Sequence, residues 1–162
     1  MSSVRRPVAT CHVFVMLCAA IYLVSLAGCG SGEPFGYVSV PGKVTYDDGT
    51  PIQGPNQHLK LVFIPVNPPP SPDPKMSAPK AKVDVHSADG TFPADEVTSH
   101  NFGDGLLPGK HKVQIIPYDD KDQMLPGLVP QEYRDAKTTP VEVDTANGEL
   151  IIKVKKPAPG SK

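Results

Sequence analysis

The 162-residue chain is rich in residues that interrupt helices, and its charges nearly cancel. It contains 20 Pro and 14 Gly and has no Trp. Each interior proline costs a helix roughly 3 kcal/mol, so this composition excludes a helical bundle and favours strands joined by turns. The 16 Lys and Arg residues balance 17 Asp and Glu residues. Because nucleic-acid binding needs a basic excess to neutralise phosphates, we expect no nucleic-acid partner.

The first 28 residues differ in composition from the rest of the chain. Arg5 and Arg6 are their only charged residues, and an apolar stretch follows over residues 13–24. A basic head, an apolar segment of this length and small residues at its end are typical of a secretory signal peptide, which we expect to be helical. The alternative is an uncleaved membrane-spanning helix, because about 20 apolar residues suffice to cross a bilayer.

The small residues at the end of this leader run directly into a cysteine. Residues 26–29 read Leu-Ala-Gly-Cys, and this motif resembles the bacterial lipobox. The resemblance implies cleavage between Gly28 and Cys29, followed by acylation of the Cys29 sulfur and the new amino group with chains such as palmitate. Two or more acyl chains give stable anchoring. We therefore expect an exported lipoprotein, anchored at Cys29 to the inner or outer membrane of a bacterium, on a periplasmic or outer face.

Cleavage at this position would leave Cys29 as the only cysteine, because Cys11 and Cys18 lie in the leader. No internal disulfide could then form, and a thioether at Cys29 would block a thiol exposed outside the cytoplasm. Loss of Arg5 and Arg6 with the leader changes the balance to 14 basic and 17 acidic residues, a net charge of −3. The remaining 134 residues are suited to one domain.

The mature chain reads as one strand-rich domain between two short flanking segments. We expect a lipidated tether over residues 29–36, a folded domain over residues 37–156 and a frayed tail over residues 157–162. Apolar patterning predicts strands over residues 37–46, 59–66, 81–86, 91–92, 112–115, 140–143 and 149–154. About seven strands separated by turns favour an antiparallel Greek-key β-sandwich. Residues 67–80 hold six prolines and predict a solvated insertion that leans toward polyproline geometry.

Three turn motifs resemble those of a known family. Residues 40–52 run from Val-x-Gly-x-Val-x-Tyr into Asp-Asp-Gly-Thr-Pro-Ile, residues 88–92 read Ala-Asp-Gly-Thr-Phe, and residues 105–113 read Gly-Leu-Leu-Pro-Gly-Lys-His-Lys-Val. They resemble the carboxypeptidase regulatory-like domain, a transthyretin-like β-sandwich, and their order is similar to that in small lipoproteins of planctomycete-type bacteria. The resemblance covers nearly all of residues 38–154, although His111 stands where an aromatic residue is more usual. It implies a fold and an envelope location, with no reaction attached.

Motifs for catalysis or metal binding are weak. The chain has no Gly-x-Ser-x-Gly elbow and no Gly-rich phosphate loop. Ser99, His100 and Asp104 have the residue types of a nucleophilic site, but side chains so close in sequence rarely face one another productively. Asp84 and His86 share one strand face, and two ligands alone make a weak metal site. A hydrolase would need a pocket joining a carboxylate to two of three histidines, His86, His100 and His111. We expect no catalytic residue, cofactor or metal.

Ligand binding is the main alternative to a purely structural or protein-interaction role. Asp119, Asp120 and Asp122 form the densest acidic cluster and could bind Ca²⁺ weakly, although the Gly and Glu of an EF-hand loop are missing. Tyr118 and Tyr133 lie in predicted loops, where exposed rings could stack on sugars. The leading hypothesis is a noncatalytic, lipid-anchored envelope module that contacts proteins. The alternative is a module that binds glycan or Ca²⁺ through Tyr118 and the three aspartates.

Overall fold

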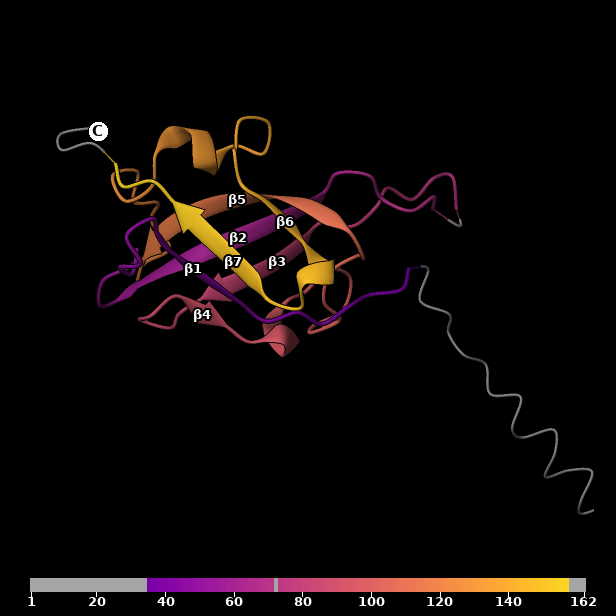
Figure 1. Cartoon of the computed structure of the whole chain (residues 1–162), viewed down its shortest axis with the longest axis horizontal. Coiled ribbons are helices and arrows are strands. Elements are labelled where there is room, and N and C mark those ends of the chain that lie inside the picture. The colour runs from indigo at the N-terminus through magenta and orange to yellow at the C-terminus, as the bar shows by residue number, and fades with distance from the viewer. Residues whose placement is uncertain (1–34, 72, 158–162) are drawn as a thin grey trace, which may run out of the picture. The chain divides into compact units, whose positions relative to one another are not determined.

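A computed structural model describes residues 35–71 and 73–157, which form two β-sheets packed as a sandwich (Figure 1). The three-stranded sheet has the order β4 (Thr91–Phe92), β1 (Gly42–Tyr46), β7 (Leu150–Val154). The four-stranded sheet has the order β3 (Ala81–Val85), β2 (Gln57–Pro65), β5 (Lys110–Asp119), β6 (Glu142–Asp144). The connections contain three short 3₁₀ turns, η1 (Ala94–Glu96), η2 (Gln131–Arg134) and η3 (Thr145–Asn147).

The predicted fold class, an all-β sandwich of seven strands, is confirmed. The predicted signal peptide and the lipidation site at Cys29 lie outside the described residues. Within the described ranges, no helix is long and apolar enough to cross a membrane.

One strand pair departs from the antiparallel pattern that the sequence predicted. β1 and β7 run parallel, from Gly42 beside Leu150 to Tyr46 beside Val154. All other pairs between named strands are antiparallel. Parallel neighbours cannot be joined by a tight hairpin. Here the chain passes through the whole four-stranded sheet between β1 and β7, so the last strand returns beside the first in the same direction.

The core lies between the two sheets and is built from alternate residues of each strand. Side chains along a strand point to opposite faces, so one parity is buried and the other is exposed. β3 and β7 show this alternation without interruption, as the sequence pattern predicted. The largest fully buried apolar side chains are Phe63, Phe92, Leu59, Leu61, Leu106, Leu107, Ile115, Leu150 and Ile152.

β5 is longer than the sequence predicted. It pairs with β2 from His111 beside Pro65 to Asp119 beside Gln57, so Tyr118 lies in a strand and not in a loop. The carbonyl of Pro117 accepts from the N–H of Leu125, so the backbone groups of Pro117 point away from β2. The N–H that proline lacks therefore removes no hydrogen bond between β5 and β2.

His111 occupies a buried core position in β5. Its side chain is buried, and its ring meets that of Phe63 edge-on with 6.5 Å between centroids. Nδ1 lies 3.1 Å from the carbonyl oxygen of Gly109. Burial lowers the pKa of His111, which favours the neutral imidazole. The ring therefore fills the space of an aromatic side chain and keeps one polar contact.

Residues 120–141 cover the edge of β5 beyond its short pairing with β6. The N–H of Val113 donates to Val141, and the hydroxyl of Thr139 donates to the carbonyl of Val113 at 2.6 Å. The buried ring of Tyr133, in η2, packs into the core cluster beneath this segment. An exposed strand edge invites pairing with another chain, and this cover removes that opportunity along most of β5.

Candidate functional site

A row of three rings crosses the outer face of the four-stranded sheet. Tyr118 of β5 lies directly beside His58 of β2, and His86 follows the end of β3 on the other side of His58. The His58 ring is stacked with both, at centroid distances of 5.0 Å to His86 and 5.4 Å to Tyr118. We call His86, His58 and Tyr118 the ring row. His58, the middle ring, is buried, whereas Tyr118 is partly exposed and His86 is exposed.

Charged side chains extend this surface. Lys60 lies next along the outer face of β2, with its Nζ 5.2 Å from the centroid of the Tyr118 ring and 3.6 Å from Oδ1 of Asp84. Nε2 of His58 lies 3.5 Å from Oδ1 of Asp122. Exposed ion pairs of this kind add little to stability. They do hold polar groups of both signs around the ring row.

The predicted acidic cluster does not converge into one site. Oδ1 of Asp119 accepts from the backbone N–H groups of Lys121 and Gln123, at 2.9 and 2.8 Å, so this carboxylate caps its own turn. Asp122 faces His58, and Asp120 is exposed at the loop surface. Across the described ranges, no group of three or more His, Cys, Asp or Glu residues is arranged to hold a metal ion. The arrangement therefore favours a turn over a Ca²⁺ site.

The loop at residues 99–105 is organised by one carboxylate. Asp104 accepts from the backbone N–H groups of Ser99, His100 and Asn101 at 2.7–2.8 Å. The hydroxyl of Ser99 donates to the carbonyl of Gly105 at 2.6 Å. Ser99, His100 and Asp104 are thus joined by hydrogen bonds from backbone N–H groups to the carboxylate, and these bonds order the loop.

This loop presents Phe102, which at 84 % relative exposure is the most exposed large apolar side chain among the described residues. Sequence reasoning missed it and considered only tyrosines as loop aromatics. The signal was present, because an aromatic residue between Asn101 and Gly103 in a polar turn has no strand partner to bury it. A large exposed ring on an ordered loop is a contact surface that is available without rearrangement.

A groove of about 470 Å³ joins the Phe102 loop to the ring row. Its wall is the outer strand β3, which is linked to the segment before the loop by a pair of 2.8 Å backbone bonds between Lys82 and Thr98. The lining residues are Lys82, Val83, Asp84, His86, Glu96, Thr98 and Phe102. An aromatic ring beside carboxylate, ammonium and imidazole groups matches the composition of sites that bind small polar ligands.

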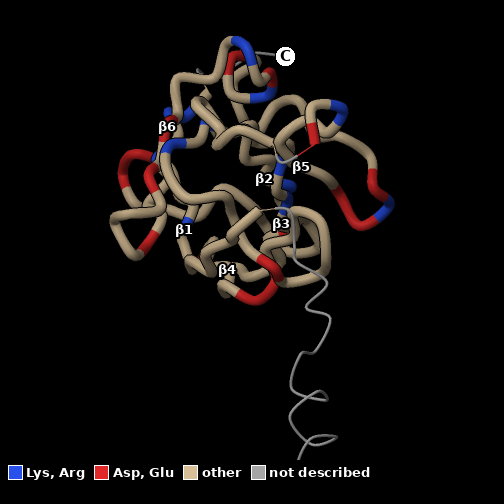
Figure 2. The backbone as a smooth tube through the Cα atoms, turned by 90° about the vertical axis from the view of Figure 1, so that its right-hand side faces the viewer, with Lys and Arg blue, Asp and Glu red and all other residues tan. Residues whose placement is uncertain are grey.

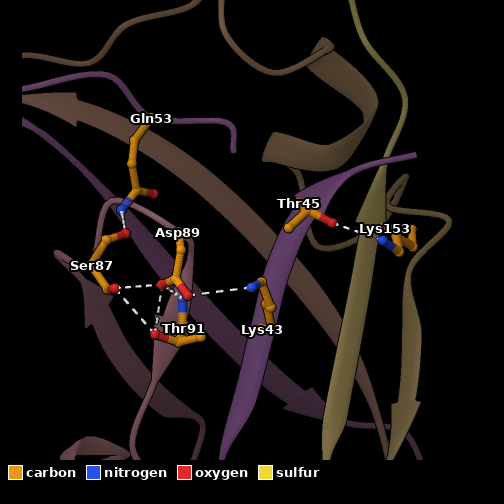
Figure 3. Close-up of polar contacts among 7 residues, drawn as sticks. All are labelled: Lys43, Thr45, Gln53, Ser87, Asp89, Thr91 and Lys153. Atoms are coloured by element: carbon orange, nitrogen blue, oxygen red, sulfur yellow. Dashed lines mark hydrogen bonds and ion pairs between the residues drawn. The ribbon is translucent and has the colours of Figure 1, made fainter. Parts of the chain in front are cut away.

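A second polar cluster has the residue types of a catalytic site but serves a turn (Figure 3). The carboxylate of Asp89 accepts from the hydroxyls of Ser87 and Thr91, at 2.6 and 2.8 Å, and lies 3.3 Å from Nζ of Lys43. The hydrogen bonds from Ser87 and Thr91, together with Lys43, hold the pKa of Asp89 well below its usual range. Gln53 donates to the carbonyl of Ser87. The hydroxyl contacts order the β3–β4 turn itself, and the contacts with Lys43 and Gln53 tie this turn to neighbouring segments.

The histidines that a hydrolase would need are not brought together. His111 is buried in the core, whereas His86 lies on the outer face of the same sheet. The imidazole that contacts His86 belongs to His58, one of the histidines that could join Asp84 and His86 only if the fold brought them together. The two rings are stacked with an interplanar angle of 30°, and among the described residues no third His, Cys, Asp or Glu joins them in a metal-holding group.

Charges of both signs are interspersed around the loops of the domain (Figure 2). This distribution agrees with the near balance of acidic and basic residues in the sequence. No family model, curated protein or solved structure matches the chain.

Proposed function

We propose that this chain is a noncatalytic, lipid-anchored cell-envelope protein whose β-sandwich acts as a protein-interaction module. The Leu-Ala-Gly-Cys motif at the end of an apolar leader supports anchoring at Cys29. Only five residues separate Cys29 from Phe35, the first described residue, which would keep the sandwich close to the membrane surface. We further propose that the domain is a transthyretin-like member of the carboxypeptidase regulatory-like group, since its turn motifs resemble that group.

The observation that carries the interaction role is the proline-rich insertion at residues 67–80. It leaves the sandwich between β2 and β3 and extends away from the two sheets (Figure 1). Its base is held by a 2.9 Å bond from the N–H of Val66 to the carbonyl of Lys110. A tight hairpin would need only two to five residues here, so the additional length is not needed to connect the strands.

The described part of the insertion exposes its side chains and bonds mainly to itself. Asp73 accepts from the N–H of Lys75 through its carboxylate and from the N–H of Met76 through its carbonyl, both at 2.9 Å. Met76 is 40 % exposed. Proline-rich segments are preorganised and dock into aromatic-lined grooves of partner proteins at low entropic cost. The proline content and exposure of the insertion therefore suit it as a ligand for such a groove.

Two variants of the full-length chain test the two halves of this proposal. Cys29→Ser should move the protein from the membrane to the soluble fraction, and unchanged membrane fractionation would contradict the anchoring half. Replacement of residues 68–77 by a short Gly-Ser turn should leave the unfolding midpoint within about 1 °C, because the loop contributes little to the core. The same replacement should abolish crosslinks to envelope proteins, and unchanged crosslinks would contradict the interaction half.

A second candidate function, glycan binding, is favoured by Phe102 and the adjoining groove. Sugar rings stack on exposed aromatic side chains while their hydroxyls bond to nearby carboxylates and cations. Phe102, Asp84 and Lys82 line one groove and supply these groups. Calorimetric titration with soluble N-acetylglucosamine oligomers should give heat that Phe102→Ala removes and Met124→Ala, a matched exposed control, retains. An absence of heat with the unmodified chain would contradict this candidate.

A further inference from the structure

The outer edge of β7 carries backbone groups without a partner among the described residues. β7 is the last strand of its sheet and pairs only with β1. The N–H of Leu150 donates to Pro41 and the carbonyl of Val154 accepts from Asp47, so even-numbered residues bond toward β1. The N–H and carbonyl groups of Ile151 and Lys153 must then point to the open side. Such an edge can accept another strand.

Shallow hollows beside this edge leave room for a strand. One has a volume of about 480 Å³ and the other about 310 Å³, and Ile151 and Glu142 line both. Ile151 is 54 % exposed, although every other apolar residue of β7 is buried. An exposed β-branched residue at the centre of an open strand edge is the feature that edge-protected strands avoid.

The order of charges along this segment selects the strand that would fit. Glu149 precedes the strand, Lys153 lies within it and Lys155 follows it. An antiparallel copy of the same segment would place each Glu149 opposite a lysine, and opposite charges on facing strand positions are favourable. A parallel copy would align the lysines with each other. We propose that a second copy of this chain binds here, through antiparallel β7–β7 pairing about a twofold axis.

Backbone contacts within one chain fix the register. Pairing centred on Ile151 sets Ile151 opposite its own copy and Glu149 opposite Lys153, and it uses the open backbone groups of Ile151 and Lys153. A shift centred on residue 152 would require the N–H of Lys155, which already donates to the hydroxyl of Tyr133 at 3.2 Å. Lys153 Nζ donates to Thr45 at 2.9 Å (Figure 3), which leaves two of its three protons for Glu149.

Cysteine crosslinking in the full-length chain tests this register. Directly opposed residues in a bonded antiparallel pair have Cα atoms about 5.5 Å apart, within the range that a disulfide spans. Ile151→Cys should therefore give an oxidised dimer at least fivefold above the unmodified chain. Lys153→Cys, a matched control on the same face of the strand, should stay at the background level. Equal yields from the two variants, or no dimer from Ile151→Cys, would overturn the proposal.

Charge exchange provides the second test and does not depend on membrane anchoring. Glu149→Lys in the Ile151→Cys chain should lower the dimer yield at least fivefold, because lysines would then face each other. Adding Lys153→Glu should restore it, since the pair is re-formed with reversed polarity. Restoration excludes misfolding as the cause of the loss. A double variant that remains as low as the single variant would refute the pairing, whatever the outcome of the Cys29 experiment.

Discussion

The sharpest test of how the turn motifs build the sandwich is Gly90, at the turn before β4. Its φ is +80°, in the left-handed region that favours glycine, and a Cβ at this position would lie 2.0 Å from the carbonyl oxygen of Val44. The N–H of Val44 donates to the carbonyl of Gly90 at 2.9 Å. The turn therefore fits against β1 only without a side chain at this position.

Gly90→Ala should destabilise the domain through two separable effects. The left-handed conformation costs a residue with a Cβ roughly 1–2 kcal/mol. Relief of the clash with Val44 adds about 1–3 kcal/mol, the usual cost of overpacking. The total of about 2–5 kcal/mol should lower Tm by roughly 6–20 °C in a domain of this size. Urea unfolding followed by far-ultraviolet circular dichroism measures the loss directly.

Gly49 provides the matched control because its φ is +83° and a Cβ there would meet no atom within 4 Å. Gly49→Ala should cost only the conformational part, roughly 1–2 kcal/mol. The difference between the two variants isolates the contact with the Val44 carbonyl. Equal losses for Gly90→Ala and Gly49→Ala would refute the reasoning, since backbone conformation alone would then explain both.

Three further predictions concern pH and the two faces of β7. Burial lowers the pKa of His111, so the unfolded chain binds this proton first and stability falls as pH drops below about 6.5. His111→Phe should therefore reduce the difference in urea midpoint between pH 7 and pH 5. A difference equal to that of the unmodified chain would contradict the prediction. Hydrogen bonds from Ser87 and Thr91 lower the pKa of Asp89. The stabilisation of the fold by the Asp89 carboxylate is therefore present at neutral pH and lost as pH falls below about 4. Asp89→Asn should lower the urea midpoint at pH 7 and reduce the drop in that midpoint between pH 7 and acid pH. An unchanged drop would contradict the prediction. In the core, Ile152→Ala should cost about 2–5 kcal/mol, whereas Ile151→Ala should stay within about 0.5 kcal/mol at protein concentrations where the chain is monomeric and this side chain is exposed. Equal losses in denaturant titration would reverse the assigned faces.

Local sequence patterns were sufficient to predict most strands and their faces. Alternation placed Val83, Val113 and Ile152 toward the core, and all three are buried there. The pattern could not show that β1 and β7 run parallel, because strand direction depends on how distant segments return to one another. It also ended β5 too early, at residue 115, because the pairing of residues 116–119 with β2 cannot be read from local alternation.

The candidate site was harder to predict because it depends on cross-strand register. His58 and His86 are 28 positions apart in the sequence. Their rings stack because antiparallel pairing of β2 with β3 sets Leu59 beside Val85, next to the two histidines. The sequence singled out Tyr118 and Asp122, but it could not show that His58 lies between them. The predicted acidic ligands are largely engaged by their own turn and by His58. The spacing of residues along the chain does not show which strands lie side by side, so it cannot predict contacts between them.

Site-specific photocrosslinking in intact cells tests the interaction role most directly. A photoreactive residue at Met76, in the proline-rich insertion, should form one discrete adduct with an envelope protein. A synthetic peptide of residues 67–80 should compete with this adduct in isolated envelopes, and the same peptide with its prolines replaced by alanine should not. The same photoreactive residue at exposed His100 should give no such adduct. Absence of an adduct at Met76, or identical adducts from both positions, would contradict the account.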